Sequence, residues 1–278
     1  MNPCSLFGSN KAIHFLVVVI YYLLVVLPHA IVGRKLNALF ENYSRATYNL
    51  IILSLVLVGL CLGSWLLKEK IRAHPDRSVM ILYILFSLIA LSFCYGLLFV
   101  INIEAIHFVQ YAFLAILLFP VMKSCRNIMS LTILLGAMDE LYQYLVLDTK
   151  APYYDFNDVL FDAIGAGLGL LFLKVIGAKT KLRSPSPWWK KLEWQLTLAV
   201  SVILLSLYAT DLFAVNPAVG EPVFFTLFKK APSGFWTYPP GPYARLHILT
   251  PIPGLLLIFG VGYIYGLLDK FRPTIELN

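Results

Sequence analysis

Long apolar runs constrain the fold of this chain more than any other feature of its sequence. The hydrocarbon core of a bilayer is about 30 Å thick, and a helix needs roughly 20 consecutive apolar residues to cross it. Because a lipid-exposed strand edge would leave backbone groups without hydrogen bonds, runs of this length predict helices. We therefore expect an all-α fold, a polytopic transmembrane helix bundle of about eight spans. The expected spans are residues 12–33, 47–67, 79–101, 104–123, 127–147, 156–178, 193–213 and 247–268.

The composition excludes a soluble globule and a disordered chain. Of the 278 residues, 59% are hydrophobic and 13% are charged, with a mean hydropathy of +0.78. Soluble domains carry roughly 25% charged residues, and disordered chains are polar and poor in aromatic residues. The run at 12–33 is longer than a signal-peptide core and no small-residue cleavage site follows it, so we expect a retained helix. The four cysteines lack the spacing of a disulfide framework or a zinc site.

The sequence divides into three parts. We expect three transmembrane helices in residues 1–100, a core of three helices in 101–178, and two helices with a long extracytoplasmic loop in 179–278. That loop, residues 214–246, contains six prolines and several aromatic residues. Because proline interrupts helices, we expect an irregular segment on the membrane surface, with a half-buried re-entrant segment as the alternative.

The basic residues set the expected orientation. The net charge of +7 would suggest nucleic acid in a soluble protein, but here the basic residues lie in loops, as the positive-inside rule requires. Fourteen Lys and Arg fall on one side of the expected spans and seven on the other, with Lys174 inside a span. This split predicts that both termini are cytoplasmic. The tryptophans and lysines at 188–194 fit an interfacial anchor on that side, with a signalling patch as the alternative.

Acidic residues gather at one end of three consecutive spans. An ionisable group at the bilayer centre costs roughly 2.5–3.5 kcal/mol on insertion scales, so such groups are rare and usually functional. In the expected topology the fourth and sixth spans begin outside and the fifth ends outside. Their polar residues therefore lie within about two helical turns of the extracytoplasmic face, and Gln110 and Asp139 accompany them. The candidate ligand-binding residues are Glu104, His107, Tyr111, Glu140, Gln143, Asp155, Asp158 and Asp162.

The spacing of these residues predicts that they face one another. The polar pairs of the fourth and fifth spans are each three residues apart, so each pair shares a helix face. The three aspartates of the sixth span follow at i, i+3 and i+7. Gly165 and Gly169 continue that stripe as GxxxG, a seam that lets a neighbouring helix approach closely. We therefore expect the stripe to face the bundle, where three helices enclose a polar cavity that is open to the outside.

Each residue taken alone has a simpler interpretation. Asp155 begins a helix, where a carboxylate serves as an N-cap. His107 alone would be a satisfied core histidine, and the GxxxG pattern indicates packing, which is the role we assign to it. His14, His29 and Asp211 are expected to be structural, although Asp211 is the one best placed to join the cluster. The combination on three helices at one depth is what favours a functional site.

The order and spacing of these residues resemble a known family. The motifs E-x-x-H-F-x-x-Y, E-x-x-Q and D-F-N-D-x-x-x-D-x-x-G-x-x-x-G follow one another within residues 100–178. This arrangement is similar to the VanZ-like membrane protein family, whose pattern has a His-bearing helix, an E-x-x-Q helix, and an Arg before D-x-x-D-x-x-x-N-x-x-G-x-x-x-G. Two positions differ from that pattern. Asp162 stands where the family has Asn, and Pro152, with Lys150 nearby, stands where it has Arg.

The resemblance implies a setting rather than a reaction. It implies an integral membrane protein of the bacterial inner membrane and cell envelope, connected with low-level resistance to the glycopeptide teicoplanin. In one hypothesis the acidic and histidine residues bind a lipid-linked or cell-wall-related ligand at the outer leaflet. In the alternative the same carboxylates serve a metal-dependent membrane enzyme or a proton-coupled transporter.

The charge of the cluster limits what it can bind. Five carboxylates face one histidine, so an anionic headgroup would be repelled unless a cation bridges it. The natural guests are a divalent metal ion, an amine or protons. No other cofactor is indicated, since the sequence lacks a serine nucleophile motif, a phosphate loop and a nucleotide fingerprint. The expected partners are the lipid bilayer and a lipid-linked or cell-wall ligand, and neither nucleic acid nor a soluble protein partner is indicated.

Overall fold

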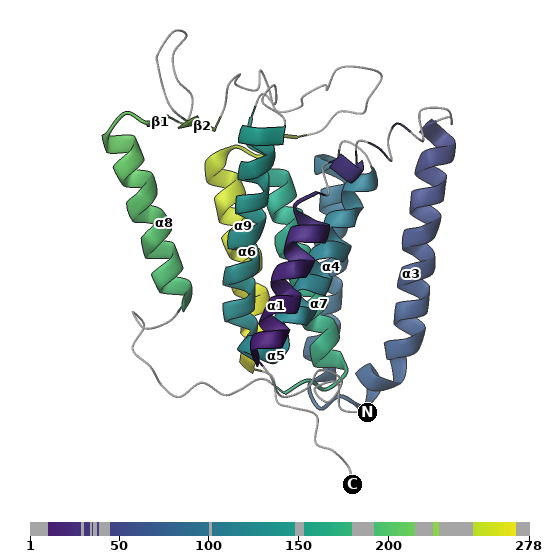
Figure 1. The fold of residues 1–278 in the computed structure, drawn as a ribbon. Coiled ribbons are helices and arrows are strands. Elements are labelled where there is room, and N and C mark those ends of the chain that lie inside the picture. Colours follow the sequence, from purple (N-terminus) through teal and green to yellow (C-terminus); the bar gives the residue numbers. More distant parts are fainter. Residues whose placement is uncertain are drawn as a thin grey trace.

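The computed structural model of the chain is mostly helical (Figure 1). It describes residues 11–28, 31–33, 35, 38, 45–99, 102–147, 153–179, 192–214, 225–227 and 247–270. These residues form one α-helix for each apolar run of the sequence, so the helical expectation is confirmed. The helices are α1 (Lys11–Tyr21), α3 (Arg45–Ala73), α4 (Arg77–Phe93), α5 (Ile106–Met122), α6 (Cys125–Tyr142), α7 (Phe156–Val175), α8 (Leu192–Ala209) and α9 (Pro251–Gly266).

Helix α7 is the central element of the bundle. Of its 20 residues, 17 are buried, and it packs against α5, α6, α9 and α4. Helix α1 packs on α5, while α3 and α8 stand at the periphery against α4 and α6 (Figure 1). Successive helices alternate in direction. As a result α5, α7 and α9 begin, and α4 and α6 end, at the upper end of the view in Figure 1.

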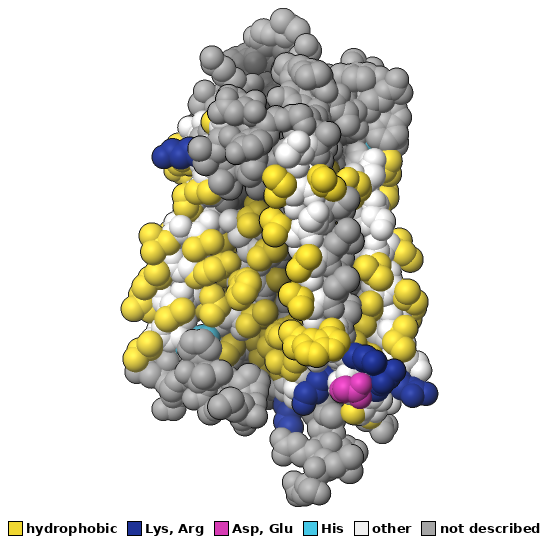
Figure 2. Space-filling model, turned by 90° about the vertical axis from the view of Figure 1, so that its right-hand side faces the viewer, with side chains coloured by type: hydrophobic (Ala, Val, Ile, Leu, Met, Phe, Trp, Pro, Cys, Tyr) yellow, Lys and Arg dark blue, Asp and Glu magenta, His cyan; other side chains and the backbone are white. Residues whose placement is uncertain are grey.

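Part of the bundle has the length and hydropathy of membrane-crossing helices. Hydrophobic side chains cover the middle of the face in Figure 2, whereas Lys, Arg and an acidic side chain gather at its lower end. At that end of α3, Lys68 and Lys70 are exposed, and Arg72 pairs with Glu69 at 3.2 Å. Among the described residues, three segments are both long and apolar enough to cross a bilayer: Ala12–Gly33, Arg77–Leu98 and Pro251–Lys270. The apolar helices Ile106–Met122 and Leu198–Ala209 are shorter.

Local chemistry moves several helix boundaries away from the hydropathy limits. Helix α3 continues past residue 67 to Ala73. Its last turns are charged and exposed, so they are helical although hydropathy does not detect them. Helix α6 starts two residues early, with Ser124 as an N-cap that accepts a hydrogen bond from the Asn127 N–H at 3.4 Å. Helix α9 starts at Pro251 rather than at residue 247. Proline suits the first helical position and disfavours a helical residue before it.

The ends of three helices widen into π-helical turns at the upper end of the bundle in Figure 1. These turns are η2 (Tyr22–Val26) after α1, η3 (Cys94–Leu98) after α4 and η5 (Gln143–Leu147) after α6. Such turns are rare and occur frequently at functional sites. Two short 3₁₀ segments, η4 (Asn102–Ala105) and η7 (Leu267–Lys270), precede α5 and follow α9.

The segment expected to be an irregular loop contains a short strand pairing. Strand β1 (Phe213–Ala214) pairs in parallel with β2 (Phe225–Thr226). Hydropathy gave no sign of this pairing, because two residues are too few to show a strand periodicity. The prolines of 214–246, and with them the choice between a surface and a re-entrant segment, lie outside the described residues.

Two glycines let α7 approach α5 closely. A Cβ atom on Gly165 would lie 2.7 Å from both the Cα and the carbonyl oxygen of Phe108. A Cβ atom on Gly169 would collide with the carbonyl oxygen of Ala112. The GxxxG seam therefore faces α5, and it brings the two backbones into contact.

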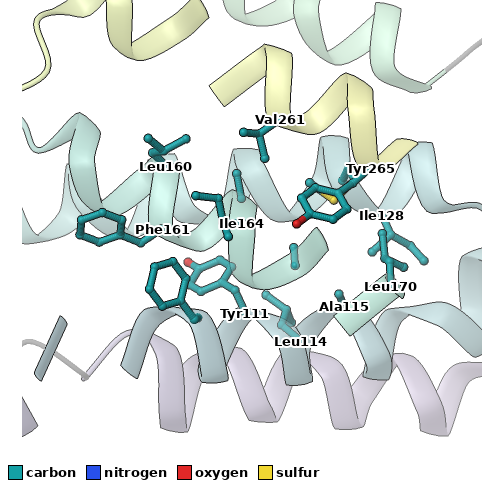
Figure 3. Packing of buried hydrophobic residues seen from close by; sticks show 14 of the residues in the cluster. Tyr111, Leu114, Ala115, Ile128, Leu160, Phe161, Ile164, Leu170, Val261 and Tyr265 are labelled. Atoms are coloured by element: carbon teal, nitrogen blue, oxygen red, sulfur yellow. The ribbon is translucent and has the colours of Figure 1, made fainter. Parts of the chain in front are cut away.

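An apolar core holds α7 in place beside the polar residues. Figure 3 shows Tyr111 and Leu114 of α5, Ile164 and Leu170 of α7, and Tyr265 of α9 in one cluster. All five side chains are fully buried. Burying side chains of this size contributes roughly 1.5–3 kcal/mol each in a soluble protein. In a bilayer, close packing takes over most of that role.

Candidate functional site

A histidine between two aspartates forms the centre of the candidate site. His107 lies in the first turn of α5, and Asp158 and Asp162 lie one turn apart on α7. The His107 Nδ1 atom is 2.8 Å from Asp162 Oδ1, which is hydrogen-bond distance, whereas Nε2 is 3.6 Å from Asp158 Oδ2. His107 and Asp162 are buried, while the Asp158 side chain is 18% exposed. Asp158 is therefore the member of this trio that a ligand can reach.

Helix α6 adds further acidic groups beside the trio. The Gln143 amide donates to Glu140 Oε1 at 2.6 Å, and both Glu140 and Asp139 are buried. The strongest electrostatic influences on Glu140 come from carboxylates, with that of Asp158 the largest. Because like charges in a buried site repel one another strongly, the cluster requires protons or a cation to be stable.

The backbone of α6 lies directly against the inner aspartate. A Cβ atom on Gly136 would sit 2.5 Å from Asp162 Oδ2. The missing side chain at Gly136 thus leaves the space in which the Asp162 carboxylate turns toward His107. Helices α5, α6 and α7 meet at this carboxylate.

Two tyrosines border the cluster on its deeper side. Tyr111 is one turn deeper than His107 on α5 and is fully buried, and its hydroxyl has no hydrogen-bond partner among the residues that the structure describes. Tyr22 of η2 donates its hydroxyl to the Leu135 carbonyl of α6 at 2.7 Å. Both hydroxyls lie within electrostatic range of the Asp162 and Asp139 carboxylates. Helix α1 therefore supplies a fourth wall that the sequence pattern did not indicate.

Asp155 combines the two roles considered from the sequence. It is the N-cap of α7, where its carboxylate accepts the Asn157 N–H at 2.9 Å. Burial, followed by repulsion from Asp158, raises the pKa of Asp155 to about 7. This half-buried residue thus starts the helix and also adds to the acidic group at the upper end of the bundle in Figure 1.

The segment around β2 is tied to the ends of α6 and α7. The Tyr144 hydroxyl donates to the Thr226 carbonyl at 2.7 Å. The Tyr154 N–H donates to the Leu227 carbonyl at 2.9 Å, and the Tyr154 hydroxyl donates to the Ala137 carbonyl of α6 at 2.8 Å. The long connection is therefore anchored beside the acidic residues.

Asn157 anchors the other end of the same connection. Its amide group donates to the His247 carbonyl at 2.9 Å and to the Leu98 carbonyl at 3.4 Å, and its Oδ1 accepts the Leu249 N–H at 3.0 Å. One buried side chain thus joins η3, α7 and the non-helical residues before α9.

The remaining sequence candidates lie in different surroundings. Glu104 is half-buried on the 3₁₀ segment η4, before α5 rather than in its first turn. Asp211 is exposed at the end of α8 in a left-handed conformation with φ 57°, so it is not part of the buried cluster. His14 is a core histidine whose Nε2 lies 2.7 Å from the Leu117 carbonyl oxygen. His29, together with the Lys150 and Pro152 of the family comparison, lies outside the described residues.

Two buried polar residues of this region were left out of the candidate ligand-binding set. Asp139 was named only as accompanying the candidates of its span, yet it is buried like Glu140. The signal was available, since any acidic residue in an apolar span avoids lipid whichever face it occupies. Asn157 stood inside the D-F-N-D motif, but its partners lie far away in the sequence and no local pattern indicates them.

The opposite end of the bundle carries polar contacts of a structural kind. The Asp269 carboxylate of η7 accepts the Cys125 and Arg126 N–H groups at 2.7 and 3.1 Å and the Ser124 hydroxyl at 2.9 Å. A carboxylate at a helix N-terminus satisfies donors that have no partner within the helix. This group caps α6 and links it to the end of α9.

No family model, curated protein or solved structure matches the chain. In the part of the chain that the structure describes, no group of three or more His, Cys, Asp and Glu residues is arranged to hold a metal ion. The functional argument is therefore built on the geometry and charge of the cluster.

Proposed function

We propose that this chain is a multi-pass protein of the bacterial inner membrane that binds an amine-bearing ligand of the cell envelope. The eight α-helices cross the bilayer, both termini are cytoplasmic, and the acidic cluster opens toward the outer leaflet. The alternation of the helices (Figure 1) and the fourteen-to-seven split of basic residues support this topology. The observation that carries the proposal is the histidine held between two carboxylates, with buried Glu140 beside them.

The charge of the site selects a cationic group. Its members are carboxylates with one histidine, so a phosphate or carboxylate headgroup would be repelled. A primary ammonium has three N–H donors and no acceptor, which matches a site rich in carboxylate oxygens. Asp158 is partly exposed, and Asp155 lies half-buried at the start of the same helix. An amine entering from the outer leaflet would meet these two residues first and Glu140 behind them.

The ligand class follows from the position of the site. An amine at the outer end of a membrane bundle belongs to a lipid headgroup or to a lipid-linked or cell-wall precursor. The metal-dependent enzyme requires several ligands around one point, an arrangement that the described residues do not present. An amine ligand therefore has the better support.

The same residues support membership of the VanZ-like family as part of the proposal. The motifs that carry the resemblance place their His, Glu and Asp members in one cluster. On this basis, raised or abolished expression should change susceptibility to envelope antibiotics, teicoplanin first. Unchanged inhibitory concentrations across a panel of envelope-active drugs would remove the support for this part of the proposal.

Amine recognition is tested with short-chain lipids and purified full-length protein in detergent. Short-chain phosphatidylethanolamine should raise the melting temperature, whereas phosphatidylglycerol with the same chains should not. Glu140→Gln should remove the difference between the two lipids. Glu69→Gln is the matched control, since Glu69 is exposed and lies near the C-terminal end of α3, at the end of the bundle away from the acidic cluster. Equal stabilisation by both lipids would contradict the amine proposal.

The topology is tested by labelling single-cysteine variants with an impermeant reagent in intact spheroplasts. Cysteines placed in residues 148–155 and 214–246 should react, and those in 68–78 and 179–191 should not. The reverse pattern would put the acidic cluster on the cytoplasmic side.

A further inference from the structure

The ring of His107 joins a buried carboxylate to a partly exposed one. Its Nδ1 atom lies 2.8 Å from Asp162 Oδ1, and Asp162 is fully buried. Its Nε2 atom lies 3.6 Å from Asp158 Oδ2, and the Asp158 side chain is 18% exposed. The two ring nitrogens therefore differ, since Nδ1 faces a buried residue and Nε2 faces the residue that a ligand can reach.

The two distances give the two ring nitrogens different roles. The separation of 2.8 Å is that of a hydrogen bond, and a carboxylic acid is a stronger acid than an imidazolium, so the shared proton lies on Nδ1. The separation of 3.6 Å is too long for a hydrogen bond. Asp158 Oδ2 thus attracts a protonated Nε2 by charge, without a hydrogen bond in this contact that would keep a second cation away.

The other charged groups at this end of α5 are acidic. On the elements packed against it these are Glu104 of η4, Asp139 and Glu140 of α6, and Asp155, Asp158 and Asp162 at the start of α7. The nearby hydroxyls of Tyr22 and Tyr111 are neutral at pH 7. Among these groups His107 is the one base, so its ring is where a positive charge can be carried and lost.

We propose that the ammonium group of the ligand and the Nε2 proton of His107 compete for Asp158, so that the site exchanges one proton for one amine. This inference rests on the amine proposal and adds the chemistry of the binding step. Without ligand, an imidazolium ring lies between two carboxylates that attract it. When an ammonium donates to Asp158 Oδ2, a second positive charge comes close to Nε2 and repels the first.

The exchange conserves the charge of the trio. The N–H bond at Nε2 breaks, and the proton leaves to water past the partly exposed Asp158. The neutral ring keeps its Nδ1 proton and its hydrogen bond to Asp162. One positive charge replaces another, so no net charge is added to a site whose inner members are buried, where added charge is costly.

Proton exchange makes ligand affinity depend on pH in a defined way. If one proton leaves for each amine that binds, the association constant rises up to tenfold for each pH unit over the range in which His107 is protonated in the free protein. The site would therefore hold its ligand in neutral medium and release it in acid.

The test counts the protons released when short-chain phosphatidylethanolamine binds to purified full-length protein in detergent. Isothermal titration calorimetry at pH 7 in phosphate and in Tris, two buffers with different ionisation enthalpies, gives the number of protons per bound lipid. We expect about one proton, and an affinity that rises up to tenfold from pH 6 to pH 7. The amine of the lipid has an ordinary pKa of about 10 and stays protonated throughout.

Three variants assign the proton. His107→Asn keeps an amide N–H near the position of Nδ1 but removes the titratable ring, so it should bind without proton release. Asp155→Asn removes the other group that titrates near pH 7 and should keep the release. His14→Gln is the matched control, because His14 is another buried histidine and its Nε2 contacts the Leu117 carbonyl. It should release as many protons as the wild type.

The outcomes separate this inference from the amine proposal. Selective binding of phosphatidylethanolamine without proton release would overturn the exchange and leave the amine proposal in place. An undiminished release in His107→Asn, or a release that disappears in Asp155→Asn, would overturn the exchange as well. Equal binding of phosphatidylethanolamine and phosphatidylglycerol by the wild type would overturn both.

Discussion

The contact between α5 and α7 offers a sharp test of how the bundle is held together. Gly165→Ala adds one methyl group whose position is fixed by the helix. That group would lie 2.7 Å from the Cα and carbonyl oxygen of Phe108, whereas nine in ten Cβ contacts are longer than 3.4 Å. Backbone atoms cannot rotate away, so the two helices must separate by several tenths of an ångström.

The magnitude follows from two opposing effects. Overpacking of a well-packed core costs about 1–3 kcal/mol, and alanine gains about 1 kcal/mol over glycine in helix propensity. Because the contact is with backbone on one side, we expect the upper part of the first range and a net loss of about 2 kcal/mol. At about 2–4 °C per kcal/mol for a chain of this size, the melting temperature should fall by about 4–8 °C.

The assay is thermal unfolding of the purified full-length protein in detergent, followed by intrinsic fluorescence. Gly260→Ala on α9 is the matched control, because this glycine is exposed and an added Cβ would meet nothing within 4 Å. It should keep or slightly raise the melting temperature through helix propensity alone. A Gly165→Ala variant as stable as Gly260→Ala would refute the close approach of α5 and α7.

Three further outcomes are expected from single substitutions. The pKa of Asp155 is raised from 3.8 to about 7 in the folded chain, so protonated Asp155 favours the folded state. This contribution to stability is present at low pH and is lost as the pH rises through 7. Between pH 5 and 8 the melting temperature should therefore fall less steeply in Asp155→Asn, which keeps the N-cap acceptor, than in the wild type. Asp211→Asn changes an exposed aspartate and is the control, which should behave like the wild type. Equal slopes in all three proteins would contradict this prediction. Asn157→Ala should lower stability by about 1–3 kcal/mol in the same melt, because buried backbone groups lose their partners; an unchanged melt would mean that this anchor is dispensable. Gly136→Ala should push the Asp162 carboxylate aside and weaken the stabilisation by phosphatidylethanolamine. Its melting temperature should fall less than that of Gly165→Ala, since a side chain can rotate away from the new methyl group and a backbone cannot. Intact lipid selectivity would contradict this prediction.

Hydropathy located the helices because lipid-length apolar runs have few alternatives to a helix. It failed at the boundaries, where other chemistry decides. The exposed end of α3 is helical without being apolar, and Pro251 delays the start of α9 past two buried residues outside any helix, Ile248 and Leu249. The π-helical turns and the pairing of β1 with β2 depend on neighbours that no local window contains.

The candidate site followed from spacing where its members lie on one helix. Asp158 and Asp162 are one turn apart and therefore share a face, so their common contact with His107 was accessible from the sequence. The contributions of Tyr22 and Asn157 were not accessible. Their partners, the carbonyls of Leu135 and His247, are about 90 or more residues away along the chain.

Packing and chemistry in this bundle depend on the same face of α7. The stripe that carries Asp158 and Asp162 continues one turn later into Gly165, and Gly165 meets the backbone of Phe108, the residue after His107. A larger residue in the seam would push α5 away, and the His107 ring would leave hydrogen-bond distance of Asp162. The small residues are therefore what lets a histidine on one helix reach a carboxylate on the next. For this reason substitutions in the glycine seam should alter ligand binding together with stability, whereas substitutions of exposed apolar residues on α3 or α8, such as Leu55 or Leu205, should alter neither.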